Sequence, residues 1–511
     1  MNKNYDTIII GSGAGGGTIA HKLALTGRSI LILERGDFLP REKENWDPAA
    51  IFALGHYNPG EEWIDREGKS FVPGTHYFVG GNTKFYGAAL LRLRERDFGE
   101  IEHYGGISPA WPLKYADFKP YYREAEHLYE VHGQRGEDPT EPHDEIAYAY
   151  PPVSHESRMQ EIVGLLTGEG LKPFHLPLGI RLNEKHREES LCIRCDTCDG
   201  YPCLVDAKSD AHHICIVPTL KQQNNVRLLT RAKALRILTD ESGSKATEIE
   251  VLHQGEIKRF RANQIIVSCG AINSAALLLR SVSSRHKQGL ANSSGLVGRN
   301  YMCHLNSAIV ALSRRKNPVH FQKTIGINDF YFGADDSKLP LGHIQLLGKV
   351  KGAMLEGDAP FFTPRFILDW MADHAIGWWI TSEDLPDREN RVLVDDHGRI
   401  HLHCVQKNQE AHRRLLKKLE HILDATGHFH HFPNKAYLAK KIPLAGVAHQ
   451  VGTCRFGTDP KTSVLDLHCR THDVENLFVV DGSFFPSAGA VNPALTIIAN
   501  ALRVGEYLKN H

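Results

Sequence analysis

The hydrophobic positions at the start of the chain predict a strand, a helix and a second strand in quick succession. Residues 5–10 form a short apolar run, residues 18–26 have helical character and end before Gly27, and residues 29–33 form another apolar run. Short apolar runs of this length are typical of buried strands. With a helix between them they predict a βαβ unit within the first 35 residues.

Similar patterns continue along the chain. We expect helices over residues 114–131, 271–281 and 411–426, and strands within 225–240 and over 264–267. Residues 305–440 have a different residue pattern. Apolar and polar residues alternate at 391–394 and 400–405, which indicates an antiparallel sheet with covering helices. Residues 40–80 and 133–158 suggest irregular loops and a connector, and residues 470–511 return to a strand followed by a helix. The pattern predicts an α/β protein with a separate α+β part.

The turn after the first strand carries glycines at spaced positions. Gly11, Gly13 and Gly16 occupy the positions of a G-x-G-x-x-G turn, and Glu34 follows Gly13 by 21 residues. Such glycines allow a tight turn, backbone approach to a pyrophosphate and close helix packing. A carboxylate at this offset binds a ribose hydroxyl, and an acidic residue there argues against a ribose 2′-phosphate. The turn therefore predicts a bound dinucleotide, which the glycines alone leave open as NAD or FAD.

Composition excludes some functions. The chain of 511 residues has 60 Lys and Arg against 60 Asp and Glu, and this zero net charge argues against a nucleic-acid partner. No signal-peptide pattern is visible at the N-terminus, so we expect a cytoplasmic protein. Residues 482–502 carry no charge, but Pro486, Gly489 and Pro493 interrupt them, so we expect buried protein and no membrane association.

Several distant blocks resemble the glucose–methanol–choline (GMC) oxidoreductase family. They are the N-terminal turn with residues 31–36, the glycine pair in 79–83, the segment 270–274, and the C-terminal segments 448–455, 479–482 and 491–494. The resemblance implies a Rossmann-like FAD-binding domain and an α+β substrate domain with an antiparallel sheet. We expect the FAD-binding domain to be discontinuous, over residues 1–100, 190–300 and 441–511. The substrate domain and connecting segments would then comprise residues 101–189 and 301–440.

The resemblance also implies roles for individual residues. It makes His449 the base that removes a hydroxyl proton and Asn492 a hydrogen-bond donor to the same oxygen, tasks that suit a neutral imidazole and an amide. Phe85 stands where some members attach FAD through a histidine, so we expect FAD to be held without a covalent bond. The expected FAD-binding residues are Gly11, Gly13, Ala14, Gly16, Glu34, Arg35, Gly80, Gly81, Asn82, Asp481, Asn492 and Pro493.

Within the family, the C-terminal blocks look most similar to bacterial pyranose oxidases and glycoside oxidases. The resemblance then implies oxidation of a CH–OH group of a sugar or glycoside by hydride transfer to flavin, with oxygen or another electron acceptor. The alternatives are a dehydrogenase of a simple alcohol, choline-like or long-chain, and a lyase that holds flavin without redox use. A choline-like substrate needs an anionic or aromatic cage, for which Trp378 and Trp379 are candidates.

Four cysteines are clustered. Cys192, Cys195, Cys198 and Cys203 have a spacing that can bind an iron–sulfur cluster or zinc. The final gap and the position of proline differ from the ferredoxin pattern, which favours structural thiols or one disulfide, so we expect no metal there. We interpret His304 and His343 as structural residues.

Overall fold

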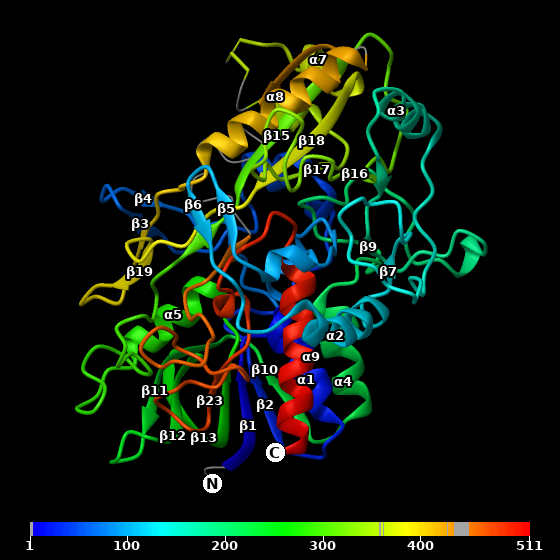
Figure 1. Cartoon of the computed structure of the whole chain (residues 1–511). Coiled ribbons are helices and arrows are strands. Elements are labelled where there is room, and N and C mark those ends of the chain that lie inside the picture. The colour runs from blue at the N-terminus through cyan, green and yellow to red at the C-terminus, as the bar shows by residue number, and fades with distance from the viewer. Residues whose placement is uncertain (1–3, 357–358, 361, 427, 434–448) are drawn as a thin grey trace.

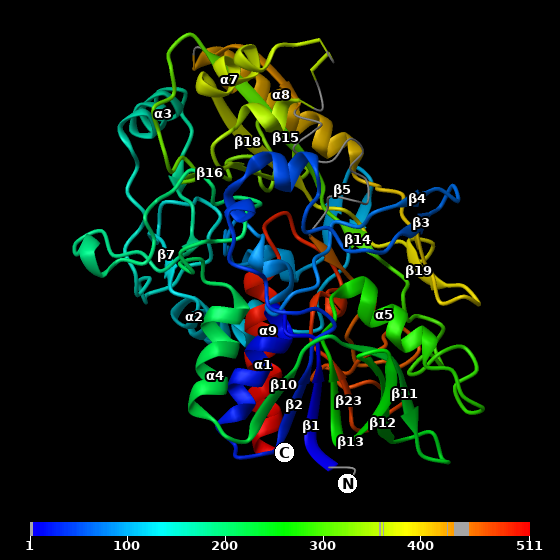
Figure 2. The same ribbon diagram turned by 180° about the vertical axis from the view of Figure 1, so that it is seen from behind.

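The computed structural model describes residues 4–356, 359–360, 362–426, 428–433 and 449–511 (Figure 1). A largely parallel sheet occupies the end of the molecule where both termini lie, and an antiparallel sheet occupies the opposite end (Figures 1 and 2). The α/β architecture with a separate antiparallel sheet is therefore confirmed.

The sheet near the termini is built from buried apolar strands. Five strands run parallel in the order β10–β2–β1–β13–β23, namely Val226–Leu229, Ile30–Leu33, Asn4–Ile10, Glu256–Val267 and Leu477–Val479. Strands β12 (Ala246–His253) and β11 (Ala232–Thr239) extend it antiparallel from the first half of β13. Parallel strands covered on both faces have continuous apolar sequences, which is why the runs at residues 5–10 and 29–33 were informative.

The helix after the first strand begins earlier than the pattern predicts. Helix α1 spans Ala14–Ala24, whereas the sequence suggested residues 18–26. Gly15, Gly16 and Gly17 form its first turn, although glycine has low helix propensity. Close packing explains their presence, because a Cβ on Gly15 would lie 2.0 Å from the carbonyl oxygen of Val480. Tertiary contact overrides local propensity at this position.

Further helices cover the sheet. Helix α9 (Ala494–Asn510) packs along α1, and α2 (Tyr115–Leu128) packs on α9, as Figures 1 and 2 both show. Helix α5 (Ala271–Arg280) contacts β11, and α4 (Val217–Gln222) lies near α1. Residues 482–502 are almost entirely buried in this region. No helix among the described residues is both long and apolar enough to cross a membrane.

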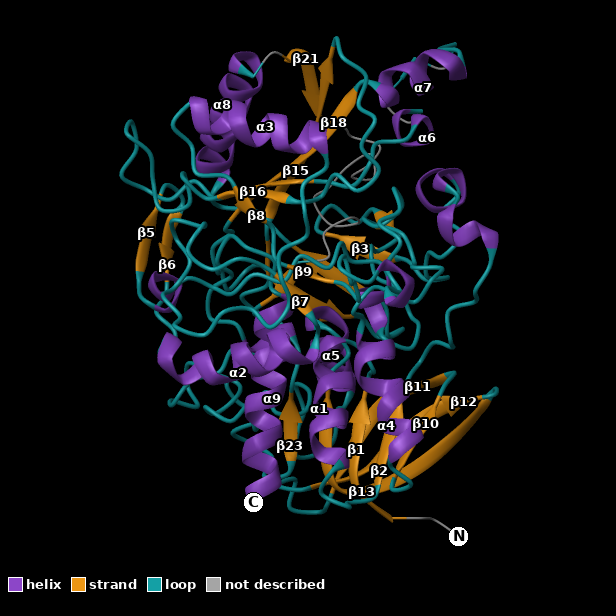
Figure 3. Ribbon diagram, turned by 90° about the vertical axis from the view of Figure 1, so that its right-hand side faces the viewer, coloured by secondary structure: helices purple, strands orange, loops and turns teal. Residues whose placement is uncertain are grey.

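The second large sheet is antiparallel throughout (Figure 3). Its order is β21–β15–β18–β17–β16–β8, namely His428–Pro433, Leu305–Ser313, Ala375–Ser382, His343–Leu346, Ile325–Ile327 and Phe174–His175. Helix α8 (Gln409–Ala425) packs on β15 and β18. Helices α3 (Ser157–Gly168), α6 (Gly352–Leu355) and α7 (Arg365–Asp373) lie at the same end (Figure 3).

Smaller sheets join segments that are far apart in sequence. A four-stranded sheet has the order β19–β20–β3–β4, namely Arg391–Val394, Ile400–His403, Trp63–Asp65 and Ser70–Phe71. Two-stranded sheets pair β5 (Ile101–His103) with β6 (Gly106–Ser108), β7 (Val131–His132) with β9 (Leu178–Gly179), and β14 (Met302–Cys303) with β22 (Gln450–Val451). The proposed domain boundaries stay a prediction.

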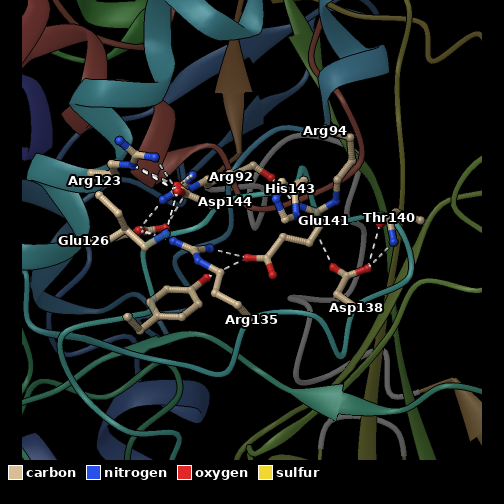
Figure 4. A network of polar contacts seen from close by, with 12 residues as sticks. Arg92, Arg94, Arg123, Glu126, Arg135, Asp138, Thr140, Glu141, His143 and Asp144 are labelled. Atoms are coloured by element: carbon tan, nitrogen blue, oxygen red, sulfur yellow. Dashed lines mark hydrogen bonds and ion pairs between the residues drawn. The ribbon is translucent and has the colours of Figure 1, made fainter.

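A network of ion pairs fixes the connector at residues 133–158 (Figure 4). Arg92, whose side chain has no exposed surface, is 2.6 Å from Glu126 and 2.7 Å from Asp144. The further pairs are Arg94–Asp138, Arg123–Asp144, Arg135–Glu126 and Arg135–Glu141. Buried charges persist only when they are paired and hydrogen-bonded, so this network ties the connector to helix α2 and to the segment preceding it.

Candidate active site

The three glycines of the glycine-rich turn have different roles. Gly11 has a φ of +100°, and a Cβ on Gly16 would lie 2.0 Å from the carbonyl oxygen of Gly11. Both positions therefore require glycine for packing. A Cβ on Gly13 would meet nothing closer than 4.0 Å, at Gly80 and Gly81. Of Gly11, Gly13 and Gly16, only Gly13 faces open space, as expected of the glycine that lets the backbone approach a pyrophosphate.

A cavity of about 620 Å³ lies in front of this turn and continues toward the antiparallel sheet. Most of the predicted FAD-binding residues line it: Gly11, Gly13, Ala14, Glu34, Arg35, Gly81, Asn82, Asp481, Asn492 and Pro493. The other two predicted residues do not line the cavity. Gly16 packs against Gly11. Gly80 lies behind the cavity wall, where its N–H donates to the Ser12 hydroxyl at 3.1 Å and its φ is +97°.

Glu34 is buried at the end of β2. It accepts hydrogen bonds from the Ser12 hydroxyl (2.6 Å), the Ser12 N–H (3.1 Å) and the Gly36 N–H (2.9 Å). Burial raises the pKa of its carboxyl group, and these hydrogen bonds act against that rise. Glu34 thus braces the turn in addition to lining the cavity. The neighbouring Arg35 forms an ion pair with Glu61 at 2.9 Å.

The second glycine pair begins a short 3-10 helix at Gly81–Lys84. The side-chain oxygen of Asn82 accepts from the His76 N–H at 2.8 Å, which fixes the wall of the cavity. Phe85 also lines the cavity and stacks on the His76 ring, with centroids 3.8 Å apart. A phenyl ring, which carries no atom able to bond covalently to a ligand, therefore faces the cavity at this position.

Asp481 connects two of the sequence blocks. It is buried, and its carboxylate accepts from the Ser274 hydroxyl, from the Gly270 N–H at 3.0 Å and from the Ser483 N–H at 2.8 Å. Burial raises its pKa, and these hydrogen bonds act against the rise. Asp481 holds the start of α5 against the segment that follows β23, on the wall of the cavity.

The two predicted catalytic residues meet on this cavity. The Nδ2 atom of Asn492 is 3.3 Å from Nε2 of His449, although the residues are 43 positions apart. Asn492 precedes α9, where Pro493 takes the N-cap position. Protein encloses the His449 ring except where it faces the cavity. Burial lowers the pKa of His449 well below its usual value, and Lys323 and two other histidines add to the effect. The ring is therefore neutral near neutral pH.

His304 touches His449, a contact that sequence reasoning missed. The two Nδ1 atoms are 3.1 Å apart, and burial lowers the pKa of His304 to about 4. The pairing of β14 with β22 brings them together, and that pairing leaves no local signal in the sequence. His343 is a structural residue as expected, since it contacts Asn328 and Gln345.

The far end of the cavity lies against the antiparallel sheet. Asn306, Lys323, Gln345 and Trp379 line it, and Lys323 forms an ion pair with Asp199 at 2.9 Å. Trp378 packs into a hydrophobic cluster instead, because successive residues of a strand face opposite sides. The suggested cage of two tryptophans is therefore wrong.

The cysteine-rich segment supplies Asp199. Cys192, Cys195, Cys198 and Cys203 are free thiols, and burial raises the pKa of Cys192 and of Cys198 to about 12. Among the described residues, sets of three potential ligand atoms within 4.8 Å of one another occur at Asp210, His212 and His213 and at Cys303, Asp384 and Cys404. Neither set includes the cysteine cluster. Lys208 holds the segment by donating to the carbonyl oxygens of Cys198 (2.9 Å) and Tyr201 (2.7 Å).

The residues present fit a flavin dinucleotide. Gly13 leaves the space that a pyrophosphate needs, and the cavity runs from this turn past Glu34 to His449 and Asn492. Such an arrangement is that of a flavin-dependent oxidoreductase. Comparisons with known proteins agree: two family models described as GMC oxidoreductase match residues 176–306 and 386–501.

Whole-length relatives extend this match. Paromamine 6′-oxidase of Streptomyces fradiae is 32% identical, covering 98% of this chain and 90% of its own, and 6‴-hydroxyparomomycin C oxidase of Streptomyces lividus is 32% identical over 99% and 92%. Pyridoxine 4-oxidase from Mesorbium loti has a similar fold, with a TM-score of 0.67 at 17% identity, covering 99% of this chain and all of that one. The chain belongs to the GMC oxidoreductase family, whose cofactor is FAD.

The relatives correct one detail of the sequence analysis. The two oxidases at 32% identity act, by name, on paromamine and 6‴-hydroxyparomomycin C, which are aminoglycosides. The likeness is therefore to glycoside oxidases of that kind and not to pyranose oxidases. Ala448, which begins one of the blocks that indicated the family, lies outside the described residues.

Proposed function

We propose that this protein oxidises a CH–OH group of a neutral sugar or glycoside, with His449 as the base. The observation that carries the proposal is the convergence of His449 Nε2 and Asn492 Nδ2, 3.3 Å apart, on a cavity that begins at the dinucleotide turn. A base must lie within hydrogen-bond reach of the proton it removes. A hydroxyl placed between these two atoms meets that requirement.

The chain's own residues perform the proton chemistry. His449 is neutral near neutral pH, so its Nε2 lone pair accepts the hydroxyl proton. Asn492 donates from Nδ2 to the same oxygen as negative charge develops there, which stabilises the transition state more than the ground state. The enclosing protein limits the access of water to this point and strengthens both interactions.

The same cavity supports a proposed place for the cofactor. We propose that Gly13, Ala14 and Glu34 hold the dinucleotide end, and that Gly81, Asn82 and the residues near Asp481 and Pro493 hold the ring end. Bound FAD would supply the acceptor for the hydride that leaves the substrate carbon. Phe85 carries no nucleophilic atom, which supports non-covalent binding.

The far end of the cavity supports a neutral, hydroxyl-rich substrate. Trp379 offers an apolar face for a sugar ring, and Asn306 and Gln345 offer amide groups for hydroxyls. The carboxylates of the described lining are already engaged: Asp199 with Lys323, Glu34 with Ser12, and Asp481 with Ser274. An ammonium group on a substrate therefore finds no unpaired carboxylate among these residues.

An absorption spectrum followed by anaerobic titration tests the proposal. The purified protein should show flavin bands, and a neutral glycoside or sugar should bleach them, whereas the matching amino sugar should bleach them more slowly. Bleaching by simple or long-chain alcohols but by no sugar would refute the sugar assignment and favour the alcohol dehydrogenase alternative. Flavin bands that no substrate bleaches would favour a lyase.

Two variants locate the base. His449→Ala should abolish bleaching while FAD stays bound, and unimpaired bleaching would remove His449 from its role. His412→Ala is the matched control, since His412 is equally enclosed and contacts Ser307 and Ser382 away from the cavity. Its bleaching should match the unmodified protein.

The electron acceptor is a separate question. The family includes oxidases and a 2-methyl-1,2-propanediol dehydrogenase from Mycolicibacterium austroafricanum, 26% identical over 98% of this chain and 95% of that one. We propose oxygen as the acceptor, which the two relatives at 32% identity support by their names. Reoxidation of the bleached protein in air should yield peroxide. Reoxidation only by a quinone or dye would assign a dehydrogenase.

A further inference from the structure

The pairing of two short strands places His304 against the proposed base. Strands β14 and β22 run antiparallel with Met302 opposite Val451 and Cys303 opposite Gln450. One step further along each strand, His304 stands opposite His449. The ring planes meet edge to face at 82°, and the two Nδ1 atoms are 3.1 Å apart.

The hydrogen-bond partners fix which nitrogen of each ring carries a hydrogen. Both rings are neutral, since burial lowers both pKa values. A neutral imidazole has one N–H donor and one acceptor nitrogen. Nε2 of His304 faces the carbonyl oxygen of Ala488 at 3.4 Å, and a carbonyl only accepts. The hydrogen of His304 is therefore on Nε2, and its Nδ1 is an acceptor.

The same reasoning continues into His449. Because Nδ1 of His304 accepts, Nδ1 of His449 must donate across the 3.1 Å contact. The second nitrogen of His449 then holds a lone pair. That nitrogen, Nε2, faces the Asn492 amide, whose Nδ2 is a donor. Every polar atom in the series from Ala488 to Asn492 has a matching partner in this arrangement and in no other with neutral rings.

We propose that His304 is the positioning residue that holds the hydrogen of His449 on Nδ1 and so presents the Nε2 lone pair to the substrate hydroxyl. His304 touches neither substrate nor cofactor in this role and acts only through His449. The catalytic consequence rests on the proposed function, whereas the position of the hydrogen on His449 does not. The two can therefore be tested separately.

The direct test reads the hydrogen positions without substrate. In protein carrying ring-¹⁵N histidine, two-bond ¹H–¹⁵N spectra distinguish a protonated nitrogen from a bare one, and His449→Gln identifies the His449 signals by their loss. We expect His449 protonated at Nδ1 and bare at Nε2. Protonation at Nε2 in the unmodified protein overturns the proposal, whatever the enzyme oxidises.

Two variants test the consequence. Asparagine can repeat the order of His304, with its amide N–H toward Ala488 and its oxygen toward His449, whereas leucine cannot. We expect His304→Leu to mix the two forms of His449 and to slow anaerobic flavin reduction by about 10²-fold, the lower end of what a positioned base contributes. His304→Asn should retain reduction to within about tenfold of the unmodified rate. FAD occupancy and the substrate concentration for half-maximal rate should change little in either.

A control variant and two separate outcomes complete the test. His412→Leu removes an equally enclosed histidine away from the base and should leave both spectrum and rate unchanged. An unchanged His449 spectrum and rate in His304→Leu overturns the proposal. If no substrate reduces the unmodified protein, the proposed function fails, and the spectrum alone still decides the position of the hydrogen.

Discussion

Replacing Gly13 or Gly16 by alanine separates cofactor binding from folding. A Cβ at Gly13 meets nothing within 4.0 Å, and the backbone there (φ −71°, ψ −161°) suits any residue. Gly13→Ala should therefore leave apoprotein stability unchanged or raise it by about 0.4–1 kcal/mol, since alanine restricts the unfolded chain. At Gly16 the same methyl lies 2.0 Å from the Gly11 oxygen, and overpacking of this kind costs about 1–3 kcal/mol or more.

The affinity for FAD should show the opposite order, with Gly13→Ala the more harmful of the two substitutions. A Cβ on Gly13 extends about 1.5 Å into the space where the backbone meets the pyrophosphate. The loss of one hydrogen bond to a charged group costs roughly 1.5–3 kcal/mol. This cost raises the dissociation constant of FAD about 10- to 100-fold. Titration of deflavinated protein with FAD, followed by flavin fluorescence, measures this constant, and thermal unfolding measures stability. Unchanged FAD affinity in Gly13→Ala would refute this placement of the pyrophosphate.

Three further predictions follow from named residues. Acid denaturation should release all FAD into the supernatant, because Phe85 cannot form a covalent link; flavin that stays with the pellet would contradict this. As the pH is lowered, kcat/KM should begin to fall only below pH 6.5, because the lowered pKa of His449 keeps this base unprotonated at higher pH. A fall that begins above pH 6.5 would contradict this. Arg92→Met should destabilise the protein by about 3 kcal/mol, seen as a lower Tm, because it takes one of the two arginine partners away from each of the buried carboxylates of Glu126 and Asp144. Arg123→Met, at the partly exposed edge of the same network, should lower Tm less.

The sequence predicts those features whose cause is local. The run at residues 5–10 became β1 because a strand buried on both faces needs continuous apolar residues. The early start of α1 was missed, because the benefit of Gly15 and Gly16 comes from contacts with Val480 and Gly11 and not from their helix propensity.

Features that depend on long-range pairing could not be predicted in the same way. His304 and His449 meet through the register of two-residue strands, and β3 reaches β20 across more than three hundred residues. Neither pairing has a periodicity of its own. The sequence analysis singled out His449 and Asn492 only because their blocks resembled a family, and the blocks that carried this resemblance did not include His304.

The cysteine-rich segment acquires its importance from the same kind of long-range contact. Its Asp199 reaches the far wall of the cavity and neutralises Lys323, a cation that lowers the pKa of His449. A Cβ at Gly87 would lie 1.8 Å from the Lys323 nitrogen and 2.1 Å from Asp199 Oδ1, so a side chain there would displace the ends of this ion pair. Lys208 holds the segment by two carbonyl oxygens. A segment with a metal-binding spacing of cysteines thus contributes to the charge of the far wall of the cavity, and through Lys323 to the lowered pKa of His449.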